Sequence, residues 1–222
     1  MRITASCSLA TLGLAACFAT SARASEPPPP AHGFQGSLRY GYARPVGGLQ
    51  PQAGLELTSL VDSERPLVLD LGWRFGTNPF VGAYGSIATG EPGSTYADPC
   101  GLANCALTSY RFGIEVQVSI LPSERLNPWV GAGLGYDFTR LEIEERRGKV
   151  TIGVRGWEAP RLLAGVDYRF SRYFAFGPYI DFAVGLYTDR TVDTPRYSTE
   201  RSIDQTEAHG WFSAGLRWVV LP

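Results

Sequence analysis

Eight segments of this chain alternate apolar and polar residues with a period of two. In YRFGIEVQVSI, residues 110–120, Ile114 and Val116 lie on one parity with the other apolar residues, whereas Arg111 and Glu115 lie on the other. Successive side chains of a β-strand point to opposite faces, so this alternation predicts strands with one apolar and one polar face. The other seven segments are 34–42, 67–75, 80–88, 129–139, 161–170, 174–187 and 211–220. No convincing amphipathic helix accompanies them, and we predict an all-β chain.

The connections between these segments alternate in length. Short connections at 76–78, 122–127 and 171–173 are separated by much longer ones. Short turns at one end and long loops at the other predict an eight-stranded antiparallel up-and-down transmembrane β-barrel with short periplasmic turns and long extracellular loops. Pro178 lies inside segment 174–187 and removes a backbone donor, so we expect a β-bulge there.

Aromatic residues indicate which face of the barrel meets lipid. We expect one aromatic girdle beside the short turns and a second toward the loops, because aromatic residues are enriched at both interfaces of a membrane. Beyond Phe138 the apolar parity turns charged, as expected where a strand leaves the bilayer. The expected girdle residues are Trp73, Phe75, Phe80, Tyr168, Phe170, Phe174, Phe176 and Trp218 on the turn side and Tyr40, Tyr42, Tyr110, Phe112, Tyr136 and Phe138 on the loop side. The alternative is a soluble periplasmic binding barrel with its apolar face inward, but the low charged fraction of 18% and the glycine-spaced polar faces disfavour it.

The N-terminus has the features of an export signal. A short basic start, an apolar stretch and the A-x-A site Ala22-Arg23-Ala24 predict a signal peptide over 1–24, followed by a proline-rich linker over 25–33 and the barrel over 34–222. Leu14-Ala15-Ala16-Cys17 offers an alternative, because it resembles a lipobox in which Cys17 is lipidated. Both alternatives export the chain.

Two cysteines remain after cleavage at Ala24, namely Cys100 and Cys105. Two cysteines close together in an exported chain most simply form a disulfide. Two free thiols are the alternative. A metal site is disfavoured because no histidine or third cysteine lies nearby.

Several stretches resemble a known family. With LVLDLGWRF, FVGAYGSI, SERLNPWVGAGLGYDF and a cysteine pair after the third strand, residues 34–222 resemble the small bacterial outer-membrane β-barrel proteins of the OmpA/OmpX-like type, and most of all a myxobacterial group. The resemblance implies a place in the Gram-negative outer membrane. We expect contact with outer-membrane lipid and lipopolysaccharide, and handling by the export and barrel-assembly machinery. The chain departs from many such barrels by ending VVLP after Trp218 instead of in an aromatic residue.

The predicted inner face carries charges of both signs. An eight-stranded barrel has room inside for side chains and little more, and buried charges must pair or be hydrated. We therefore expect a salt-bridged plug; a narrow ion or small-solute channel is the alternative. The partner of Glu115 cannot be read from one sequence, and Arg74, Arg161 and Arg217 are candidates from other strands. The expected lumen network comprises Arg39, Asp70, Arg74, Arg111, Glu115, Asp137, Arg161, Asp167, Arg169, Asp181 and Arg217.

Catalytic chemistry finds little support in the sequence. His32 and His209 are the two histidines. His209 and Ser213 share a strand face, but four strand residues separate them by about 13 Å, too far for a Ser–His hydrogen bond. HGWFS also lacks the His-x-Ser pattern of outer-membrane lipid A deacylases, so a lipid-modifying enzyme is a weaker alternative. We expect no enzymatic activity, cofactor or metal site, and the near-neutral charge gives no reason to expect nucleic-acid binding. The sequence names no ligand for the loops.

Overall fold

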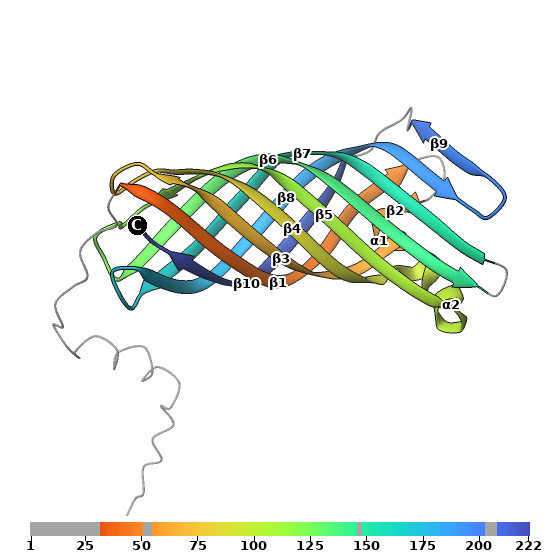
Figure 1. The fold of residues 1–222 in the computed structure, drawn as a ribbon, viewed down its shortest axis with the longest axis horizontal. Helices are drawn as coiled ribbons and strands as arrows, with labels where there is room; N and C mark the ends of the chain where they lie inside the picture. Colours follow the sequence, from red (N-terminus) through yellow and green to blue (C-terminus); the bar gives the residue numbers. More distant parts are fainter. Residues whose placement is uncertain (1–31, 51–54, 146–147, 203–207) are drawn as a thin grey trace, which may run out of the picture.

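Eight long strands close into a barrel in the computed structural model, which describes residues 32–50, 55–145, 148–202 and 208–222 (Figure 1). Each strand pairs antiparallel with its neighbours, and β10 pairs with both β8 and β1 to close the sheet. This confirms the predicted eight-stranded antiparallel barrel. The predicted signal peptide lies outside the described residues. The strands are β1 (Gly33–Gln50), β3 (Val61–Arg74), β4 (Phe80–Pro92), β5 (Asn104–Ser119), β6 (Leu126–Glu145), β7 (Gly148–Arg169), β8 (Phe174–Asp193) and β10 (Ala208–Val220).

The two ends of the barrel differ as expected. Residues 75–79, 120–125 and 170–173 make the short connections at one end, called here the turn end. The start of β1 and the end of β10 also lie there (Figure 1). The opposite end, the loop end, holds the longer connections.

Much of what was expected to be loop is regular structure. β6 and β7 stay paired as far as Glu145 and Gly148, and β8 continues into a hairpin with β9 (Ser198–Ser202). The loop end also holds β2 (Leu55–Glu56) and two short helices that the sequence did not predict, α1 (Leu57–Leu60) and α2 (Ser94–Leu102). So short a helix as α1 depends on tertiary packing more than on intrinsic propensity, and Leu57 and Leu60 are buried. Within the described ranges, neither helix has the length and apolarity needed to cross a membrane.

Large apolar side chains cover the outside of the barrel. Ile114 is 58% exposed and Leu134 is 47% exposed, although both belong to strands with buried neighbours on the opposite parity. Phe80 departs from the expected girdle: it is buried on the inner face, because Val81 takes the outward position. The outward residues that we call the apolar belt include Leu38, Tyr40, Leu69, Leu71, Trp73, Val81, Ile87, Tyr110, Phe112, Ile114, Val116, Val130, Leu134, Trp157, Leu162, Tyr168, Ile180, Phe182, Leu216 and Trp218.

The bulge expected at Pro178 is absent. Pro178 pairs with Leu216 of β10, and β7 keeps one register with β8 on both sides of it, from Gly165 opposite Tyr179 to Tyr168 opposite Phe176. A proline in a strand removes one donor without needing an extra residue. The register shifts instead at Glu158–Arg161 of β7, beside Pro160.

Candidate functional site

The lumen is the candidate site, and it contains every residue of the expected charge network. All eleven point inward, and none is more than 7% exposed. The structure adds Glu64, Glu158 and His209, which sequence reasoning did not include and which are at most 2% exposed. The charges fall into three layers along the barrel axis.

The middle layer is centred on Arg39 of β1. Its guanidinium binds Asp70 through two hydrogen bonds, with Nε–Oδ2 at 2.9 Å and NH2–Oδ1 at 2.5 Å. It also contacts Glu115 at 3.1 Å and Asp181 at 3.6 Å. Because these carboxylates come from β3, β5 and β8, one side chain links four strands across the lumen. The ion-pair partner of Glu115 is therefore Arg39, which was not among the candidates Arg74, Arg161 and Arg217. A partner across the barrel cannot be read from strand order.

Arg161 completes the middle layer from β7. It donates two hydrogen bonds from Nε to Asp181, at 3.1 and 3.0 Å, and its guanidinium lies 3.9 Å from the centre of the Tyr84 ring. Tyr84 fits because β6, the next strand beyond its neighbour β5, carries a glycine: a Cβ at Gly135 would lie 2.0 Å from the Tyr84 hydroxyl. Gly135 on the inner face therefore leaves room for a large side chain.

The layer toward the loop end has one arginine among three carboxylates. Arg111 of β5 lies 2.7 Å from Glu64, 3.6 Å from Asp137 and 3.5 Å from Glu158. Its guanidinium also stacks over the Trp211 ring at 4.0 Å. This layer is rich in acidic groups.

Aromatic rings line the same loop-side layer. Tyr187 donates a hydrogen bond to Asp137 at 3.0 Å, and its ring stacks on His209 with the centroids 3.8 Å apart. His209 and Ser213 both point into the lumen and are buried. Neither lies on the outer surface of the barrel.

The layer at the turn end is rich in arginine. Arg217 lies 3.5 Å from Asp167, donates to Gln117 at 2.6 Å and stacks over Trp129 at 4.2 Å. Arg169 donates to the backbone carbonyl of Glu124. Arg74 completes this layer.

An apolar core closes the loop end above the charged layers. Leu57 and Leu60 of α1 belong to one buried apolar cluster with inward-facing Leu141 and Ile143 of β6 and with residues of β5, β7, β8 and β10. We call this cluster the cap core: Ala43, Leu57, Leu60, Val61, Leu107, Leu141, Ile143, Ile152, Val154, Ala183, Tyr187 and Trp211. It lies where the inner faces of the strands change from charged to apolar.

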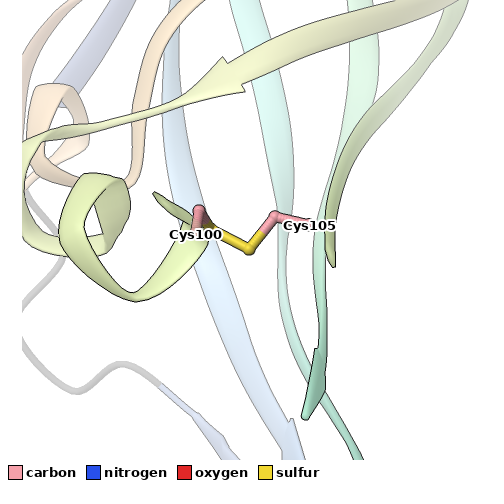
Figure 2. The surroundings of a disulfide bond; sticks show 2 residues. All are labelled: Cys100 and Cys105. Carbon is pink, nitrogen blue, oxygen red and sulfur yellow. A yellow bond between two sulfur atoms is a disulfide. The ribbon is translucent and has the colours of Figure 1, made fainter. Parts of the chain in front are cut away.

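A disulfide fastens the segment beside the cap core. Cys100 near the end of α2 is bonded to Cys105 of β5 (Figure 2). Cys105 and Tyr96 of the same segment pack against the cap core. The backbone amide of Gly93 also donates to the carbonyl of Leu60 at 2.9 Å. These contacts tie α2 to α1.

Charged side chains cover the outside of the loop end. Lys149 lies 2.7 Å from Glu142, and Arg155 lies 3.2 Å from Asp189. The hydrogen bond from Lys149 lowers the pKa of the Glu142 carboxyl. These pairs are partly exposed, so solvent screens them.

The described part of the chain contains no group of three or more potential metal ligands. No family model and no curated protein matches this chain. Among solved structures, the barrel is similar to a major outer membrane protein from Thermus thermophilus, with a TM-score of 0.51 and 12% identity, over 85% of this chain and 100% of that one. It is also similar to Neisserial surface protein A, with a TM-score of 0.47 and 12% identity over 83% and 95% of the two chains. Ail, the attachment invasion locus protein of Yersinia pestis, gives a TM-score of 0.45 and 13% identity over 83% and 97%. At these identities the likeness concerns the fold.

Proposed function

We propose that this chain is an integral outer-membrane β-barrel with a closed lumen and a structural or surface-interaction role. The observation that carries the proposal is the apolar belt around a barrel whose charges are buried inside and ion-paired. Exposed apolar patches of this extent are rare on soluble proteins. A bilayer removes the belt from water and leaves the charges in the lumen.

Two features support closure of the lumen. Arg39 bridges carboxylates from three other strands in the middle layer. The cap core fills the loop end above it with α1. An ion crossing this lumen must both displace the cap and separate buried ion pairs, which are costly to break.

A narrow ion or small-solute channel is the second candidate. The hydroxyls of Tyr84 and Tyr179 and the NH1 of Arg161 are buried without a protein partner in the described structure. Buried polar groups of this kind usually bond ordered water, and water inside the lumen favours ion passage. We also propose that His209 and Ser213 have no catalytic role, because an enzyme acting on lipid needs its reactive groups on the outer surface.

We further propose export by the signal peptide over 1–24, insertion by the barrel-assembly machinery, and contact with outer-membrane lipid and lipopolysaccharide. The OmpA/OmpX-like type suggested by sequence resemblance belongs to this proposal. Fractionation tests the location: the mature protein should sediment with outer membranes and require detergent. Full solubility without detergent contradicts it and favours a soluble binding barrel.

Conductance of the purified, refolded protein in a planar bilayer distinguishes a closed lumen from a narrow channel. We expect little or no steady current from the unmodified protein. Glu115→Ala removes one partner of Arg39, so it should raise ion leak, whereas Glu144→Ala at the exposed loop end should not. Large stable currents from the unmodified protein, with only a change of selectivity in Glu115→Ala, contradict the closed lumen.

A further inference from the structure

Arg74 is a buried guanidinium whose observed partners are all neutral. It is the last residue of β3, points into the turn end of the lumen and is 5% exposed. Its Nε donates to Gln35 Oε1 at 2.6 Å, and its NH1 donates to the Thr77 carbonyl and the Ser119 hydroxyl, each at 3.2 Å. Within the described ranges, no carboxylate forms an ion pair with it. Its charge is thus solvated by dipoles and is not neutralised.

The surrounding layer does not supply the missing negative charge. The charged groups that act on Arg74 are Arg217, Arg169 and Asp167. Asp167 is the acidic member, and it pairs with Arg217 at 3.5 Å. Arg74 and Arg217 therefore face one shared carboxylate, whereas Arg111 in the loop-side layer faces three. Burying uncompensated charge of one sign is costly, so a bound anion would stabilise this layer.

Hydrogen-bond donors without partners occur in the same layer. Gln35 Nε2 is buried with no acceptor, and its amide is held beside Arg74 by the bond to Oε1. Arg217 Nε is also buried with no acceptor. Unsatisfied buried donors cost free energy comparable to a lost hydrogen bond. Two such donors beside an uncompensated guanidinium have the chemistry of an anion site.

We propose that the turn end of the lumen binds a small inorganic oxyanion, held by Arg74 together with Gln35 and Arg217. A guanidinium matches the oxygens of an oxyanion through parallel N–H donors. Arg74 adjoins the short connection 75–79, so a free anion reaches it from the turn end without crossing the middle layer. A lipid headgroup does not, because Arg74 points inward while Trp73 and Phe75 point outward. The site goes beyond the proposed function and is independent of whether the lumen conducts.

The test measures binding of inorganic phosphate to the full mature chain in an amine oxide detergent, which carries no phosphate. Phosphorus NMR should give a saturable isotherm with one site per chain, with chloride replaced to hold ionic strength constant. The melting temperature should rise by about 3 °C for each tenfold increase of phosphate above the Kd.

Two variants and a control locate the site. Arg74→Gln should abolish binding. Gln35→Glu places a carboxylate beside Arg74, so it should raise the melting temperature in phosphate-free buffer and also abolish binding. Arg65→Gln is the control, because Arg65 pairs with Glu91 on the surface and the two side chains are 60% and 61% exposed; it should bind phosphate like the unmodified protein.

Two results overturn the proposal. One is the absence of a saturable isotherm with the unmodified protein. The other is equal binding by Gln35→Glu and the unmodified protein, which attributes the effect to general salt. If Arg74→Gln does not fold, Gln35→Glu and the isotherm of the unmodified protein still decide. Conductance plays no part in these readouts, so failure here leaves the closed lumen untouched.

Discussion

The belt region and the loop end of this barrel differ in which face of the sheet is apolar. In the belt the outer face is apolar, and at the loop end the inner face is apolar. On β6, Leu134 faces outward in the belt while Asp137 faces the lumen. A few residues further along the same strand, Leu141 is fully buried inside and Arg140 is exposed outside. The alternation of the strand does not change; the residue types assigned to its two faces do.

This inversion shows that one sheet is adapted to two surroundings. At the loop end the apolar faces meet in the cap core, as in a soluble protein, and burial of apolar surface stabilises it. In the belt the apolar faces point outward from the barrel, so ion pairs and hydrogen bonds stabilise its interior. The two regions should therefore fail in different ways when single residues are changed.

The largest effect is expected inside the belt, at Arg39. Arg39→Ala leaves Asp70, Glu115 and Asp181 without their shared cation in a buried setting. Removing one partner of a buried ion pair typically costs about 3–5 kcal/mol of unfolding free energy. Urea unfolding in lipid vesicles, followed by tryptophan fluorescence, measures it. Arg65→Ala is the control, since an exposed pair contributes at most about 1 kcal/mol; equal losses at both positions contradict an ion-paired interior.

The cap core should respond like the core of a soluble domain. Leu141→Ala creates a cavity in the cap core, with an expected loss of about 2–5 kcal/mol of unfolding free energy. Hydrogen exchange should speed up in the loop-end parts of β5 and β7 and stay slow in the belt. Leu69→Ala, on the outer face, should cost less because lipid can fill the space. Faster exchange throughout the barrel after Leu141→Ala argues against two separate regions.

The outer face of the belt provides the third comparison along a single strand. Leu134→Arg should cost about 2–4 kcal/mol if that side chain faces the middle of a bilayer. Glu144→Arg, at the exposed loop end of the same strand, should be nearly neutral. Unfolding in vesicles measures both, and equal tolerance contradicts placement of the belt in lipid.

Strand parity carried most of what could be predicted from the sequence. It placed the Arg39 and Asp181 side chains inside and Leu134 outside, because period-two alternation survives wherever the register is regular. It did not include Glu158, which lies before the recognised segment 161–170. The bulge between Glu158 and Arg161 also puts an even-numbered and an odd-numbered residue on the same face. Glu64 lies before the segment in which alternation was recognised, beyond Pro66.

Neither the ion-pair partners across the lumen nor the cap core could be predicted from the sequence. The pairing of Glu115 with Arg39 spans the lumen, and strand order carries no information on such contacts. The four-residue α1 is too short to show a periodicity. Its position follows from the burial of Leu57 and Leu60 in the cap core. The structure also shows an excess of acidic groups in the layer of Arg111 and an excess of basic groups in the layer of Arg74. Assigning a residue to a layer requires its position along the barrel axis, which the sequence does not give.

The smallest expected effect is electrostatic and lies on the outside of the loop end. The hydrogen bond from Lys149 holds the pKa of Glu142 below its ordinary value of 4.5. A carboxyl with a lowered pKa in the folded state adds stability above that ordinary value and loses it as pH falls through the folded-state pKa. Lys149→Ala should raise the pKa of Glu142 toward 4.5, as measured by carboxyl carbon NMR. Arg140→Ala should raise it less, since Arg140 contributes the weakest of the effects on Glu142. An unchanged Glu142 titration in Lys149→Ala means that the pair does not hold in solution, and that the charged outer face of the loop end is merely solvated.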